Sequence, residues 1–179
     1  MKPRLIIISD LWGTVASNWI ACYREYLSDA FEIYYYDARV IAGIGLETLS
    51  EQEIHAQFIG GGIDIAVEQL LQQKTESQIL LAFSIGGTIA WKAALKGLKA
   101  HSLYLVSSTR LRYESQKPSG NIQLLYAEKD AFRPEAKWFL ELGLDCEIIK
   151  GATHDIYRSA DFAKQITERI ILDYKNANA

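Results

Sequence analysis

Short apolar runs alternate with helix-like segments along this chain, and that alternation limits the folds open to it. The apolar runs are strand-like because they are short and rich in β-branched residues; they cover residues 4–9, 31–37, 78–84, 102–108, 122–128 and 146–151. Helical patterns lie between them, at residues 16–29, 63–74, 86–97, 134–143 and 160–174. This order predicts an α/β fold, a three-layer α/β/α sandwich around a mostly parallel six-stranded sheet. We find no internal repeat and no linker, and we interpret residues 1–179 as one domain.

Composition argues against several classes of function. The 179 residues carry a formal net charge of −3, which disfavours nucleic acid or a membrane as a partner. The apolar run at residues 5–8 is too short for a signal peptide, and no stretch is long enough for a membrane span. Cys22 and Cys146 suit neither a disulfide framework nor a metal cluster. We therefore expect free thiols in a reducing cytoplasm, with no metal and no cofactor.

A serine stands where the third apolar run must turn into a helix. Ser84 ends that run, and Gly86 and Gly87 follow it, with small alanines beyond them. A tight turn from strand to helix holds its serine in a strained, exposed conformation and needs small neighbours. The first N–H groups of the helix then lie beside the hydroxyl, where they can stabilise an oxyanion. Two other interpretations are a helix N-cap and a phosphate-binding loop, but the second lacks a G-x-G-x-x-G or Walker pattern.

The residues around this serine resemble a known family. Ala82-Phe-Ser84-Ile-Gly86-Gly87 is similar to the G-x-S-x-G nucleophile elbow of the α/β-hydrolases, with alanine in place of the first glycine. Farther along, "IQLLYAEKDAFRP" resembles the family's acid-bearing strand end, and "CEIIKGATHDIY" resembles its histidine loop. The family carries its triad in the order Ser, acid, His. The resemblance therefore implies Ser84, Asp130 and His154 as the catalytic residues.

Other residues near these positions have alternative interpretations. Glu128 lies two residues before Asp130 and is an alternative acid, although Asp130 lies past the strand end. His55 and His101 are expected to be surface or structural histidines. Arg110 and Arg112 follow the fourth apolar run at the same edge of the sheet. They could bind a substrate carboxylate or phosphate, but a solvated face is the simpler interpretation.

The N-terminal residues extend the resemblance. "IIISDLWGTVASNWIACYREYLSDAFEIYYYDAR" is similar to the family segment of strand, HGWG-like loop, helix and strand. The match implies that the backbone N–H groups of Trp12 and Ile85 form the oxyanion hole. Asp10 and Leu11 stand where His-Gly is usual. We expect the Asp10 carboxylate to be hydrogen-bonded within its own loop or held by a cation such as Arg39, because an unpaired charge there would oppose an oxyanion.

The resemblance covers residues 4–174 and indicates a compact, lidless serine hydrolase that lacks the family's first two edge strands. Only residues 109–121 join the fourth and fifth apolar runs, where larger members insert a lid. We expect residues 38–62, with a short helix near 49–58, to lie beside the site in its place. Leu11, Trp12 and Phe132 are expected to line the substrate pocket.

The implied function is hydrolysis of a carboxylic ester or thioester through a Ser-His-Asp triad and an acyl-enzyme intermediate. The expected partner is a small-molecule acyl ester or thioester, and the oligomeric state is open. Two alternatives also fit the sequence. One is a non-catalytic binding or interaction protein on the same fold, which Asp10-Leu11 favours. The other is a lyase that uses the same triad.

Overall fold

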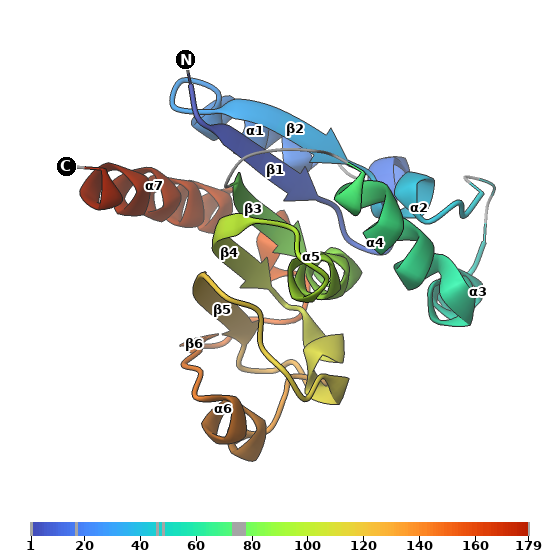
Figure 1. Ribbon diagram of the computed structural model, residues 1–179. Helices are drawn as coiled ribbons and strands as arrows, with labels where there is room; N and C mark the ends of the chain where they lie inside the picture. Colours follow the sequence, from blue (N-terminus) through green and yellow to red (C-terminus); the bar gives the residue numbers. More distant parts are fainter. Residues whose placement is uncertain (1, 17, 46, 48, 73–77, 179) are drawn as a thin grey trace.

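The computed structural model describes residues 2–16, 18–45, 47, 49–72 and 78–178 (Figure 1). Its six strands are β1 Arg4–Ile8, β2 Glu32–Tyr36, β3 Gln78–Phe83, β4 Ala100–Val106, β5 Asn121–Ala127 and β6 Glu147–Ile149. They form one sheet in the order β2-β1-β3-β4-β5-β6, and every neighbouring pair is parallel. The predicted six-stranded sheet is therefore confirmed, and the described strands are parallel throughout rather than mostly so.

The helices connect these strands. They are α1 Ile20–Leu27, α2 Ala38–Ile41, α3 Glu51–Gln57, α4 Ile63–Leu71, α5 Ile85–Leu95, α6 Ala136–Leu142 and α7 Ala160–Ala177. Shorter 3-10 turns are η1 Gly13–Ala16, η3 Thr109–Tyr113 and η4 Ile156–Arg158, and η2 Phe58–Gly62 is a π-helical turn. Residues 17, 73 and 74 of the predicted helices lie outside the described residues. The sequence did not predict α2, which begins where the Asp37 side chain accepts hydrogen bonds from the N–H groups of Arg39 and Val40.

Helices cover both faces of the sheet (Figure 1). Along β1, Leu5 and Ile7 pack with α1 and α7, whereas Ile6 and Ile8 pack with α4 and α5 on the opposite face. Successive strand residues point to opposite faces, so a sheet covered on both sides needs apolar residues at every position. This is the physical reason for the continuous apolar runs, and the three-layer prediction is confirmed.

Parallel strands bring their carboxyl ends to one edge of the sheet. Asp10 follows β1, Ser84 follows β3, Ser107 follows β4 and Asp130 follows β5. Residues that lie far apart in the sequence therefore meet at this edge. Within the described part of the chain, no helix has the length and apolar character needed to cross a membrane.

Candidate active site

Ser84 occupies the sharp turn between β3 and α5. Its backbone has φ 50° and ψ −118°, a conformation that costs energy for any residue other than glycine. The N–H of Ser84 donates to the carbonyl of Val106 on the neighbouring strand at 2.9 Å. The strand therefore stays paired up to Ser84, and the strained turn projects the half-buried side chain from the sheet edge.

The two glycines after Ser84 allow α5 to pack closely on the strand ends. A Cβ atom at Gly86 would overlap with the carbonyl oxygen of Ser9, and one at Gly87 would overlap with the side chain of Ser108. Neither glycine has a positive φ, so close approach explains both of them. The sequence pattern at this turn thus has a direct steric cause.

His154 joins Ser84 to Asp130. Its Nε2 lies 3.0 Å from Ser84 Oγ, and its Nδ1 lies 2.6 Å from Asp130 Oδ2. The histidine backbone is held as well, because Ser107 Oγ donates to the carbonyl of His154 at 2.7 Å. The other acid weighed from the sequence, Glu128, is exposed and accepts a hydrogen bond from the N–H of Gly151. The structure therefore brings Ser84, His154 and Asp130 together and leaves Glu128 apart.

The environment of Asp130 favours its charged form. Burial raises the pKa of Asp130, but hydrogen bonds from His154 and from the N–H of Phe132 outweigh burial and hold the pKa below its ordinary value. A carboxylate at this position accepts the Nδ1–H of His154. In that tautomer Nε2 has a free lone pair to accept the Ser84 proton.

Asp10 is buried, with 1% of its surface exposed, and three donors surround its carboxylate. The N–H of Trp12 donates to Oδ1 at 3.1 Å, while the Tyr157 hydroxyl and the Arg158 guanidinium donate to Oδ2 at 3.1 Å and 2.7 Å. The expected hydrogen bond within the loop is thus present. Arg39 as the compensating cation is wrong, because its guanidinium is turned to backbone carbonyls at residues 45 and 47.

The two expected oxyanion donors differ in this structure. The Trp12 N–H already donates to Asp10. Ile85 is the first residue of α5, so its N–H has no acceptor within the helix. The oxyanion hole inferred from the sequence stays a prediction, with one donor available and the other engaged.

Asp10 helps to keep the two neighbouring donors, Tyr157 and Arg158, protonated. Burial raises the pKa of Tyr157, and the nearby Asp10 charge raises it further. For Arg158, burial lowers the pKa, but the hydrogen bond to Asp10 and its charge outweigh this and raise the pKa above its usual value. The Asp10 charge is therefore compensated by a guanidinium from η4.

A cavity of about 800 Å³ opens beside these residues. Its wall contains Ser84, Asp130 and His154, and it also contains the three residues expected to form the substrate pocket, Leu11, Trp12 and Phe132. Phe132 is the most open of the three, with 66% of its surface exposed.

Helix α3 forms another part of the cavity wall. Residues 50–52 and His55 line the cavity, so the segment 38–62 lies beside the site as expected, with residues 46 and 48 outside the described residues. His55, which the sequence indicated as a surface or structural histidine, is half-buried and lines the cavity. The pattern Ser50-x-x-Glu53 signals a helix start, and both capping hydrogen bonds are present. Nothing in the sequence, however, indicates where that helix packs.

Arg110, Arg112 and Thr109 of η3 complete the cavity wall. The sequence left two interpretations of these arginines, a solvated face and a substrate-binding position, and the structure places both side chains half-buried in the cavity wall. Among the described residues, no cluster of His, Cys, Asp and Glu is arranged to hold a metal ion.

No protein-family model matches the sequence, and no curated protein matches it. Several solved structures do match. An α/β serine hydrolase without a lid from Xanthomonas campestris is 11% identical at a TM-score of 0.63, over 97% of this chain and 83% of that one. The monoacylglycerol lipase of Paleococcus ferrophilus is 13% identical at a TM-score of 0.64, over 95% of this chain and 94% of that one. Est1E from Butyrivibrio proteoclasticus, with ferulic acid bound, is 13% identical at a TM-score of 0.66, over 96% of this chain and 88% of that one. These similarities show that the chain has the α/β-hydrolase fold.

Proposed function

We propose that this protein is a serine hydrolase that cleaves a carboxylic ester or thioester through an acyl-enzyme intermediate. The observation that carries the proposal is the continuous hydrogen-bonded chain from Ser84 Oγ through His154 to Asp130, in the wall of a cavity. The hydrolases among the structural neighbours support the same reaction class.

The geometry suits two successive acyl transfers. Ser84 Oγ attacks the acyl carbon while His154 Nε2 takes the hydroxyl proton, and Asp130 stabilises the imidazolium. That proton then passes to the leaving oxygen or sulfur as its bond to the acyl carbon breaks, which releases an alcohol or thiol. Water next attacks the acyl-enzyme, and His154 takes a proton from it. Ser84 recovers that proton as its bond to the acyl group breaks, and the carboxylic acid leaves.

The tetrahedral intermediates of both steps carry an oxyanion. The Ile85 N–H stands at the positive end of α5 and suits this charge. The Trp12 N–H would be a second donor once it turns away from Asp10 Oδ1.

The second candidate function is a non-catalytic binding protein. The observation that favours it is the hydrogen bond from the Trp12 N–H to Asp10, which keeps one expected oxyanion donor engaged. This alternative retains the cavity and the fold but assigns no chemistry to Ser84.

Labelling with a fluorophosphonate distinguishes the two candidates. We expect the native protein to be labelled and Ser84→Ala to be unlabelled. Ser28→Ala is the matched control, because Ser28 is an exposed serine at the C-terminal end of α1, and this variant should be labelled like the native protein. An unlabelled native protein would favour the binding role. Labelling without turnover of any ester or thioester would favour the lyase alternative.

A further inference from the structure

The guanidinium group of Arg110 lies in the cavity wall, and no carboxylate in the described part of the chain forms an ion pair with it. Its Nε is buried and has no hydrogen-bond acceptor among the described residues. Its other nitrogens likewise form no hydrogen bond within the described residues, and its guanidinium carbon lies 5.0 Å from the centre of the Tyr113 ring. Buried donors in folded proteins nearly always have acceptors. Arg110 thus offers a fork of N–H groups that the protein itself does not satisfy.

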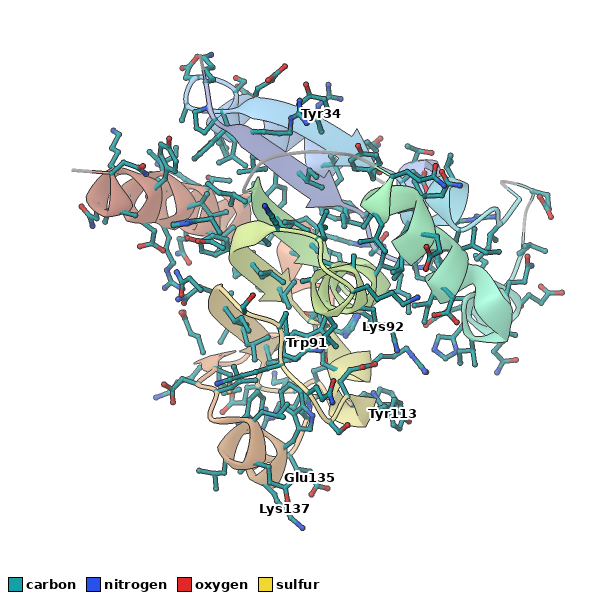
Figure 2. The ribbon with its side chains drawn as sticks, viewed as in Figure 1. Tyr34, Trp91, Lys92, Tyr113, Glu135 and Lys137 are labelled. Carbon is teal, nitrogen blue, oxygen red and sulfur yellow. The ribbon has the colours of Figure 1, made fainter. Side chains whose placement is uncertain are left out.

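Arg112 adds a second positive charge to the same wall. Its guanidinium donates to the carbonyls of Thr109 and Phe132 and to the hydroxyl of Tyr113, which is labelled in Figure 2. These acceptors are neutral, so they fix the orientation of Arg112, and its charge helps to lower the pKa of Asp130. No carboxylate in the described part of the chain lies within ion-pair distance of it.

The carboxylates of the cavity lie nearer to other cations than to Arg110. The charge of Asp10 is matched by Arg158, and Arg112 is near enough to Asp130 to help lower the pKa of that carboxyl. Glu51 is the remaining carboxylate of the described wall, and it is exposed. Among the described residues none of the three forms an ion pair with Arg110, so the wall is positive at Arg110.

The positive charges of Arg110 and Arg112 also affect the pKa of His55. Burial lowers the pKa of His55, and the charges of Arg110 and Arg112 lower it further, against the opposing effect of Glu51. A histidine with a lowered pKa is neutral at neutral pH and adds no charge to the cavity. The field at this wall comes from the two arginines.

We propose that the substrate carries an oxyanionic group, a carboxylate or a phosphate, at a distance from its scissile bond, and that Arg110 binds this group. The planar guanidinium can pair with two oxygens of either group at once, and Arg112 adds to the attraction. Apolar side chains at Leu11, Trp12 and Phe132 would cover the carbon chain between the two ends. This inference rests on the proposed function and adds the substrate class to it.

The test measures binding to Ser84→Ala, so that it does not depend on catalysis. The carboxylate probes are the monomethyl esters of succinate, adipate and suberate, and the neutral partners are methyl butyrate, hexanoate and octanoate. The phosphate probe is 1-hexanoylglycerol 3-phosphate, paired with 1-hexanoylglycerol. By calorimetry we expect at least one anionic probe to bind about tenfold tighter than its neutral partner, the magnitude of one charge-assisted hydrogen bond. The stronger of the two anionic types identifies the source of the oxyanion.

Substitutions in the Ser84→Ala background assign the effect to Arg110. Arg110→Gln should remove the preference for the anionic probe, and Arg110→Lys should retain part of it. Arg110 makes no internal hydrogen bond among the described residues, so these variants should fold, and circular dichroism checks this. Arg24→Gln makes the same change in net charge at an exposed site on α1 and should keep the preference.

Two results would overturn the inference: no anionic probe binds tighter than its neutral partner, or the preference survives in Arg110→Gln. The proposed function is judged separately, by Ser84-dependent hydrolysis of the neutral esters in the native background. Hydrolysis without any anionic preference would remove the inference and leave the proposed function intact. An anionic preference without hydrolysis would remove the proposed function and leave the binding of an oxyanionic group by Arg110 intact.

Discussion

Replacing Asp10 by asparagine removes the buried charge that organises the first loop of the site. The carboxylate accepts hydrogen bonds from Trp12, Tyr157 and Arg158. Asparagine has nearly the same shape but only one oxygen acceptor, and its NH₂ group only donates. The amide must therefore turn its NH₂ either toward Trp12 or toward the side of Tyr157 and Arg158. Retaining the bond to the charged guanidinium is the stronger choice, so we expect the NH₂ to face the Trp12 N–H.

The cost of Asp10→Asn in the free energy of unfolding depends on how exposed Arg158 is. A hydrogen bond to a charged group contributes about 1.5–3 kcal/mol. The asparagine retains the hydrogen bond to Arg158 but lacks the charge that strengthens it, and it no longer accepts from the Trp12 N–H. Arg158 keeps 33% of its side chain exposed, so water compensates part of this loss, and the lower end, about 1.5 kcal/mol, applies. For a domain of this size about 1 kcal/mol shifts Tm by about 2–4 °C. We expect Asp10→Asn to lower Tm by about 3–6 °C.

Replacing the partner of Asp10, in Arg158→Gln, should lower the free energy of unfolding by more than Asp10→Asn does. It leaves the Asp10 charge buried without a cation, and breaking a buried pair in this way costs about 3–5 kcal/mol. The remaining donors, Trp12 and Tyr157, favour the lower end of that range. The double variant should lose less than the sum of the two single variants, because it buries no unpaired charge.

The effect on activity should be small. Asp10→Asn removes a negative charge near the developing oxyanion and releases the Trp12 N–H, but Arg158 already compensates that charge. We therefore expect kcat/KM for a short-chain ester such as p-nitrophenyl butyrate to stay within about tenfold, or about 1.4 kcal/mol in the barrier. Thermal unfolding and steady-state kinetics on the same preparations measure both effects. A fall in kcat/KM beyond about a hundredfold without unfolding would show that the carboxylate is needed for the reaction. A rise far above tenfold would mean that Asp10 suppresses hydrolysis, which favours the binding role.

Three further outcomes follow from the geometry. Gly87→Ala should destabilise the protein by about 1–3 kcal/mol in urea unfolding, because its Cβ overlaps with Ser108, and it should abolish fluorophosphonate labelling; a fully stable, labelled variant would contradict the packing argument. Since the pKa of Asp130 in the folded protein lies below its ordinary value, its stabilising contribution is complete above about pH 4 and is lost as the pH falls below that value. The native protein should therefore lose stability between pH 4 and 2 more steeply than Asp130→Asn, and equal slopes would disprove this. Ser107→Ala removes the hydrogen bond to the His154 carbonyl and should lower kcat about fivefold with KM unchanged, whereas an unchanged kcat would show that this bond does not position the histidine.

The sheet could be predicted because its physical cause is local. Strands covered on both faces need continuous apolar residues, and runs such as residues 4–9 and 78–84 show this directly. The turn at Ser84 is local too, since the glycines that α5 needs lie within three residues of the serine. Asp130 and His154 came from the resemblance of their strand ends to a known family, and the parallel sheet explains why such distant residues meet.

The missed features depend on tertiary packing. The sequence indicates a helix near residues 49–58, but the placement of α3 against the cavity, and with it the position of His55, follows from the π-helical turn at Phe58–Gly62. That turn contains Gly61 at φ 131°, which redirects the chain between α3 and α4. The partner of Asp10 was also misassigned. Arg158 lies 148 residues away, on a 3-10 turn that only the fold brings to β1.

The two unusual features of this site, Asp10 and Arg110, are linked through charge. A carboxylate at position 10 would weaken an oxyanion nearby, but Arg158 compensates it at 2.7 Å, and the pair is close to neutral at longer range. Arg110 and Arg112 have no such partner among the described residues, so their field acts on whatever enters the cavity. An uncompensated Asp10 would instead repel an anionic substrate and pull the arginines toward itself. On the proposed function, the Asp10–Arg158 pair would allow one end of the cavity to bind an anion while the Ser84 end stabilises a transient one, and the two tasks would not compete for the same donors.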